Sequence, residues 1–153
     1  MKLSPRFAAS LLAFSTLLAL PPAVAGQARS VTIPFPRRGS AAVGLSNGPM
    51  RVQSVVLKGQ PVSRDYRWAR HDRDDTTLIR WVFRVANSGR RDWRARLRVR
   101  VYSADERLLA SNDREGEVDA RDWRDQITVW TRIRTLDYPR ADHVRVEAAF
   151  FPG

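Results

Sequence analysis

The segment from Trp93 to Tyr102 alternates without a break between two kinds of side chain, and every second residue from Arg94 to Arg100 is an arginine. Successive side chains of a β-strand point to opposite faces of a sheet. One face of this segment is therefore apolar and the other is basic. The pattern predicts a strand whose apolar face lies on a core and whose basic face meets solvent.

Other segments alternate with the same period of two. They are residues 50–58, 77–87, 126–136 and 143–151, with a shorter segment at 107–111. No window of this length shows a helical period with comparable clarity. Short strands at intervals of about ten residues, with turn residues between them, are typical of a β-sandwich. The sequence therefore predicts an all-β fold built from two sheets.

The remaining regular features are weaker. Residues 29–35 predict a short extended piece that is ended by prolines. Residues 37–49 are rich in Gly, Ser, Ala and Pro, which predicts a loop or a loosely held edge. The alternation of segment 50–58 slips at Val55 and Val56, as a β-bulge there would cause.

The order of the strong strands resembles the immunoglobulin-like accessory domains of exported bacterial proteins, such as the FxLYD and CARDB-type modules. The resemblance covers Leu78–Phe150 and is carried by the segments Trp81–Gly89, Leu97–Asp105, Glu106–Ala110, Ile127–Trp130 and Val144–Glu147. Glu106 departs from the pattern, because those families usually carry glycine after the aspartate of this turn. The resemblance implies an immunoglobulin-like β-sandwich with a binding or assembly role and no catalytic residues to carry over.

A charge argument predicts how the strands divide between the sheets. If segments 77–87 and 93–103 formed a hairpin, Arg84 would face an arginine of the second strand, and directly opposed like charges destabilise a sheet. In immunoglobulin-like sandwiches the corresponding connection crosses between sheets, which avoids this. One sheet would then hold 50–58, 77–87 and 126–136, and the other 93–103, 107–111 and 143–151.

The first 25 residues have the organisation of a secretory signal peptide. Lys2 and Arg6 form a charged start, residues 7–20 form an apolar run, and Ala23 and Ala25 form a cleavage motif. The apolar run is shorter than the roughly 20 residues that span a bilayer. We therefore expect cleavage after Ala25, no membrane span, and a mature protein that is periplasmic or secreted.

The expected organisation is a signal peptide at 1–25, an extended or loop N-terminal segment at 26–49, and a β-sandwich domain at 50–153. The chain has no cysteine, which excludes disulfides and thiol chemistry. Lys and Arg total 27 against 16 Asp and Glu, so the formal net charge is +11. Nearly all of these basic residues are arginine. Arginine suits contacts with carboxylates and phosphates, although a GC-rich coding sequence would produce the same preference for arginine over lysine.

No residue pattern indicates catalysis, a cofactor or a metal. The two histidines, His71 and His143, lack the spacing of zinc ligands or of a catalytic pair. The cluster from His71 to Asp75 lacks the residue order of a calcium loop, so we interpret it as a solvated loop. No serine lies in a nucleophile-elbow motif. We expect no enzyme activity, no cofactor and no metal site.

A short motif of the form Arg-Asp-aromatic-Arg occurs at residues 64–67, 91–94 and 121–124. The aromatic ring could close the rim of the core while the aspartate neutralises its neighbours and an arginine stacks on the ring. The alternative is a recurrent recognition element.

The candidate binding site is the basic face of segment 93–102. Alternate strand residues are ~6.8 Å apart, so its four arginines would form a row about 20 Å long. With the two residues expected to extend the row, the candidate site is Arg94, Arg96, Arg98, Arg100, Tyr102 and Arg145. Such a row suits a negatively charged partner. The alternative is an ordinary solvated face that loop carboxylates neutralise.

We therefore expect an exported, monomeric, non-enzymatic binding or assembly module. Its basic sheet face would contact an anionic envelope component or an acidic protein surface. No nucleic acid is expected as a partner, because export makes nucleic acid scarce. The alternative function is that of a structural periplasmic accessory subunit, which would dock through its strand edges or its N-terminal segment.

Overall fold

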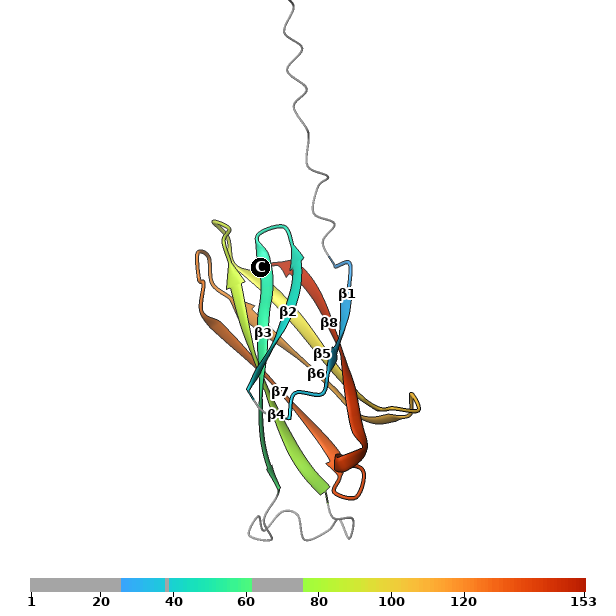
Figure 1. Cartoon of the computed structure of the whole chain (residues 1–153). Coiled ribbons are helices and arrows are strands. Elements are labelled where there is room, and N and C mark those ends of the chain that lie inside the picture. Colours follow the sequence, from blue (N-terminus) through green and yellow to red (C-terminus); the bar gives the residue numbers. More distant parts are fainter. Residues whose placement is uncertain (1–25, 38, 62–75) are drawn as a thin grey trace, which may run out of the picture.

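The computed structural model describes residues 26–37, 39–61 and 76–153. These residues form two antiparallel four-stranded sheets that pack around a shared core as a β-sandwich (Figure 1). Sheet A contains, in spatial order, β1 (Arg29–Pro34), β8 (Ala141–Pro152), β5 (Trp93–Ser103) and β6 (Leu108–Val118). Sheet B contains β2 (Ser40–Asn47), β3 (Met50–Pro61), β4 (Thr76–Asn87) and β7 (Asp125–Arg134). One turn of 3-10 helix, Tyr138–Arg140, lies between β7 and β8.

This arrangement confirms the predicted all-β, two-sheet fold. It also confirms the division of the strands, because β3, β4 and β7 share one sheet while β5, β6 and β8 share the other. The chain crosses between the sheets after β4, and Arg84 therefore faces Ser54 of β3 and Gln126 of β7 rather than an arginine of β5. Among the described residues, no helix is long and apolar enough to cross a membrane.

The core is formed by the inward side chains of both sheets. The largest fully buried side chains include Trp81 and Phe83 of sheet B and Leu97 and Phe150 of sheet A. Full burial of one such side chain stabilises the fold by roughly 1.5–3 kcal/mol. The polar edge of the Trp81 ring is satisfied, because its Nε1 donates a 2.8 Å hydrogen bond to Thr131 Oγ1. Burial of these inward side chains therefore fixes which residues of each strand point to the outer face.

The sandwich begins earlier in the chain than predicted. Residues 40–47 form β2, which is an edge strand of sheet B, whereas the composition favoured a loop or a loosely held edge. Its buried residues Val43 and Leu45 alternate with exposed small residues, and this glycine- and serine-rich composition concealed the strand pattern. Both β1 and β2 pair with strands of the sandwich. The boundary expected at residue 50 therefore does not separate an N-terminal segment from the sheets.

Two details of the strands also differ from the predictions. β6 continues for seven residues past the expected end at Ser111. The sequence did not predict this part, because a charged, exposed edge strand lacks a regular apolar alternation. The bulge of β3 falls at Gln53, where the register with β4 shifts between Val52 and Ser54. It was expected at Val55–Val56, but Val55 faces the core and Val56 lies on the outer face in regular register.

Candidate functional site

The structure brings the predicted site residues together on the outer face of sheet A. β5 lies between β8 and β6, so its four arginines form a row along the middle of this face. We call Arg94, Arg96, Arg98 and Arg100 the arginine row. Arg145 of β8 lies directly opposite Arg100, and Tyr102 follows at the end of the row.

Carboxylates from both neighbouring strands accompany the arginine row. Glu115 of β6 lies 3.2 Å from Arg94 and 3.1 Å from Arg96. Glu147 of β8 lies 3.7 Å from Arg98 and 2.6 Å from Arg100. Exposed ion pairs of this kind stabilise a fold by only about 0–1 kcal/mol each, but these two carboxylates offset part of the positive charge of the row.

The sequence interpretation missed most of these carboxylates. The segment 107–111 was expected to end at Ser111, before the acidic residues of β6. In the longer β6, Asp113, Glu115 and Glu117 face the arginine row in register. The signal was present in the sequence, since acidic residues occupy every second position from 113 to 117.

The end of this face carries a stack of rings. The Arg145 guanidinium lies 5.7 Å from the centroid of the Tyr102 ring, which stacks on His143 at 5.4 Å and 11°. Glu106 lies 3.3 Å from Nε2 of His143, and Asp142 lies 3.0 Å from Nδ1. Because the two carboxylates contact opposite ring nitrogens, they cannot share one metal ion with this histidine.

No group of three or more metal-ligating side chains occurs among the described residues. The other histidine, His71, and the cluster from His71 to Asp75 lie outside the described part of the chain. The same is true of the Arg-Asp-Tyr-Arg motif at residues 64–67.

Glu106 adopts a backbone conformation that favours glycine. Its φ is +61°, and a non-glycine residue in the left-handed region costs about 1 kcal/mol or more. The glycine that the resemblance led us to expect would fit this turn without strain. A glutamate at this position gains instead the contact with His143.

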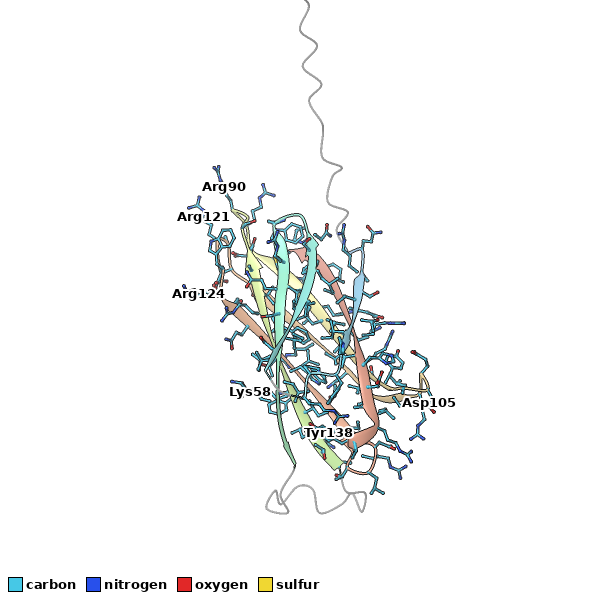
Figure 2. The ribbon with its side chains drawn as sticks, viewed as in Figure 1. Lys58, Arg90, Asp105, Arg121, Arg124 and Tyr138 are labelled. Atoms are coloured by element: carbon cyan, nitrogen blue, oxygen red, sulfur yellow. The ribbon has the colours of Figure 1, made fainter. Side chains whose placement is uncertain are left out.

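The β5–β6 turn also contains Asp105, the one carboxyl group among the described residues whose pKa is clearly shifted (Figure 2). A short hydrogen bond from the Ser103 hydroxyl, with help from a backbone N–H, lowers the pKa of Asp105 below its ordinary value of 3.8. The ionised carboxylate therefore stabilises the fold above pH 3.8, and this contribution is lost as the pH falls through the lower folded-state pKa.

We expect the substitution Ser103→Ala to raise the pKa of Asp105 toward 3.8, because it removes the main hydrogen bond to the ionised form. An NMR titration of the Asp105 side-chain carbonyl measures this pKa directly. Ser111→Ala, on the neighbouring strand, is the control and should leave the titration unchanged. An unaltered Asp105 titration in Ser103→Ala would contradict the prediction.

Sheet B presents a second basic surface on the opposite side of the sandwich. Three cross-strand rows of its outer face carry cations: Ser46–Arg51–Ala86, Ala42–Ser54–Arg84–Gln126, and Lys58–Arg80–Trp130. We define the basic face by the cations Arg51, Lys58, Arg80 and Arg84, and Figure 2 shows Lys58 pointing outward from it. Arg132 and Arg134 lie on the same side of β7 but already have interaction partners.

The basic face has no carboxylate of its own. Asp125 is the one acidic residue in the strands of sheet B, and it lies opposite Val85, whose side chain points into the core. None of the four cations forms an ion pair with a residue that the structure describes. Trp130 is 45% exposed beside them, with the Arg80 guanidinium 5.6 Å from the ring centroid. Carboxylates of the described residues therefore do not cancel the positive potential of this face.

The two described copies of the Arg-Asp-Trp-Arg motif meet at one end of the sandwich, where Figure 2 shows Arg121 and Arg124. Their aspartates bind backbone N–H groups: Asp92 accepts from Ala120 at 2.9 Å, and Asp122 accepts from Arg124 at 2.8 Å. Trp93 packs against the core, as rim packing predicts, whereas Trp123 is 59% exposed. The motif therefore shapes two turns, and only its first tryptophan closes the core.

The four edge strands carry features that hinder pairing with another strand. β1 is short and contains Pro34, and β2 has a bulge between Ala42 and Leu45. β6 exposes a run of charged side chains. The Asn112 side chain of β6 donates to the Trp130 carbonyl oxygen, which occupies one acceptor of the β7 backbone.

No family model matches this chain, and no curated protein shows significant sequence similarity to it. The geometry and charge of the two outer faces are therefore the features that indicate what this protein can bind.

Proposed function

We propose that this protein is an exported, immunoglobulin-like binding module without enzyme activity, and that it binds an anionic partner through the basic face. Export is inferred from the signal-peptide pattern of residues 1–25, and the immunoglobulin-like type from the strand pattern of the sequence. The observation that supports binding is the unequal distribution of carboxylates between the two sheets.

The two outer faces differ in uncompensated charge rather than in the number of cations. On sheet A, the arginine row and Arg145 meet four carboxylates in register, from Asp113, Glu115, Glu117 and Glu147. On sheet B, the four cations of the basic face meet none among the described residues. A field that neighbours do not cancel raises the local concentration of an anionic ligand and speeds its association. This favours the basic face over the arginine row as the binding surface.

The alternative function, docking through strand edges, receives less support. Each of the four edges carries a proline, a bulge, exposed charges or an occupied backbone acceptor. Edge pairing also depends on backbone hydrogen bonds and would persist in salt, whereas binding through exposed charges weakens as the Debye length shortens. Salt dependence therefore distinguishes the two functions.

A matched pair of double variants tests the proposal. Arg80→Gln with Arg84→Gln removes the two cations that β4 contributes to the basic face, and Arg96→Gln with Arg98→Gln removes two cations from the centre of the arginine row. Each variant loses two positive charges from a single strand. On a sulfonate cation exchanger, we expect the basic-face variant to elute at clearly lower salt than the arginine-row variant. Thermal melts should show that both remain folded, since surface changes usually alter stability by about 0.5 kcal/mol.

The other outcomes would contradict the proposal. Equal shifts in the two variants would mean that net charge alone governs retention. A larger shift in the arginine-row variant would identify that row as the binding surface, as the sequence first predicted. Binding to an envelope fraction that neither variant alters, and that salt does not weaken, would favour docking through strand edges.

A further inference from the structure

We propose that the anionic partner is a linear acidic polysaccharide that lies lengthwise along β4 on the basic face. This proposal rests on the function proposed above and specifies the chemistry of the ligand. It is supported by the shape of the charged strip, by the neutral groups that flank it, and by the single exposed aromatic side chain beside it.

The cations of the basic face form a narrow strip. Arg51 lies opposite Ala86 of β4, Arg84 and Arg80 follow along β4, and Lys58 lies opposite Arg80. The six steps from position 86 to position 80 span ~20 Å, while neighbouring strands are only ~4.8 Å apart. This shape suits one extended chain with repeated anionic groups. A planar lipid surface suits it less well, because adjacent strands are rotated by about 20° and turn the cations out of one plane.

The flanks of the strip are rich in uncharged polar groups. The outer-face positions beside the cations include the hydroxyl and amide side chains of Ser40, Ser46, Ser54, Gln126 and Thr128. All of them are exposed or half-buried, so they can donate hydrogen bonds to sugar hydroxyls and accept hydrogen bonds from them. Guanidinium groups between them can bind uronate, sulfate or phosphate groups in a bidentate manner.

Trp130 adds a ring at the Arg80 end of the strip. It lies directly opposite Arg80 on the neighbouring strand, and its exposed surface is large and apolar with a polar edge. A sugar ring has an apolar face of C–H groups that can pack on such a surface. Charge, hydroxyl partners and an aromatic ring therefore lie together on one strip.

The same features disfavour two other macromolecules. The core of a protein–protein interface is depleted in charged residues and enriched in apolar ones, whereas cations are distributed along the length of this face. Single-stranded nucleic acid is held by successive aromatic side chains that stack on its bases. Among the described residues of this face, Trp130 is the one exposed aromatic side chain, so the face offers no series of stacking rings.

Oligogalacturonides of defined length test the proposal by isothermal titration calorimetry. We expect affinity to rise with chain length and to level off once the chain spans the ~20 Å strip. Arg80→Gln with Arg84→Gln should lower the affinity about tenfold, which is 1.4 kcal/mol. Trp130→Ala should lower it severalfold, and Trp130→Phe should restore part of the loss. Arg96→Gln with Arg98→Gln is the matched control and should have little effect.

Comparison ligands separate this proposal from the more general one. Fully methyl-esterified galacturonan has the same backbone without the charges and should not bind. Poly-L-glutamate, thymidine oligonucleotides and vesicles of phosphatidylcholine with phosphatidylglycerol supply the charges without the sugar chain. If any of them binds as tightly per charge and depends on the basic face but not on Trp130, the polysaccharide proposal fails and the general function stands. If no polyanion depends on the basic face, both proposals fail.

Discussion

Replacing Asn87 with alanine should lower the free energy of unfolding by about 3 kcal/mol, because the hydrogen bonds of a buried side chain are all lost at once. The Asn87 side chain is fully buried between two turns. Its Nδ2 donates to the carbonyl oxygens of Arg91, Val118 and Asp119 at 2.8, 3.2 and 3.1 Å. Its Oδ1 accepts from the Gly89 N–H at 2.8 Å. The substitution would remove all four of these hydrogen bonds, one of them fully buried and three partly buried, and the Asp119 carbonyl oxygen would keep only its bond from the Asp122 N–H.

Urea denaturation monitored by circular dichroism measures this loss. Asn112→Ala is the matched control, since it removes the same side chain from an exposed position where Nδ2 makes one hydrogen bond to a backbone carbonyl oxygen. We expect the control to cost about 1 kcal/mol or less. Equal losses in the two variants would show that the buried network at Asn87 contributes no more than the two exposed hydrogen bonds of the Asn112 side chain.

Asn87→Asp gives a second, pH-dependent test of the same network. The substituted carboxyl keeps the shape of asparagine, but its ionised form cannot donate to the three carbonyl oxygens. Burial beside these oxygens raises its pKa above the unfolded value of about 3.9. The destabilisation should therefore be small near pH 4 and should grow as the pH rises toward the raised folded-state pKa. A loss that is independent of pH would contradict this explanation.

The sequence could predict the fold class because its strongest strands face both core and solvent. In β5 the alternation of Ala95, Leu97 and Val99 with arginines leaves no other way to bury the apolar residues. The position of Arg84 then excluded a hairpin between β4 and β5, because like charges would have been opposed. Local periodicity and one electrostatic conflict, together with the crossover that the immunoglobulin-like resemblance implies, assigned six strands to their sheets.

Two of the four edge strands, β2 and β6, could not be predicted in the same way. An edge strand has one open side, so its residues are under weaker demand to be apolar or β-branched. In β2, small residues such as Ala42 and Gly44 alternate with the buried ones, and their composition resembles that of a loop. In β6, the long charged part resembles a solvated turn. Pairing with β3 and β5 fixes these segments, and pairing is not visible in local composition.

The candidate site was only partly predictable for the same reason. Periodicity placed the arginine row on one face, but whether a cation is neutralised depends on residues of the neighbouring strands. The carboxylates of Glu115 and Glu147 reach the row from β6 and β8. The basic face shows the converse case, because Arg80 and Lys58 lie far apart in the sequence and meet only through the register of β3 with β4. Uncompensated charge is thus a property of the sheet rather than of a segment.

Replacing Gly116 with valine should destabilise the protein by about 3 kcal/mol, because β6 approaches β7 too closely for a larger side chain. A Cβ atom at this position would lie 2.9 Å from Cγ1 and 3.0 Å from Cδ1 of Ile127. Gly116→Ala should cost less, about 1–2 kcal/mol, since a single methyl group requires a smaller shift of the Ile127 side chain. Urea denaturation of both variants gives the two values.

A double-mutant cycle shows whether this steric contact is the cause. In the background of Ile127→Ala the penalty of Gly116→Val should fall by at least about 1 kcal/mol, because the space beside residue 116 is then open. Gly44→Ala is the control: a Cβ there meets nothing within 4 Å, but the φ of +68° disfavours any side chain. Its penalty should not depend on Ile127. If Ile127→Ala left the Gly116→Val penalty unchanged, the close approach of the two sheets would not be the reason for glycine at 116.

Gly116 belongs to sheet A, whereas the cations of β3 and β4 lie on the outer face of sheet B. The loss of stability should therefore come without a change in the salt-dependent binding of the basic face.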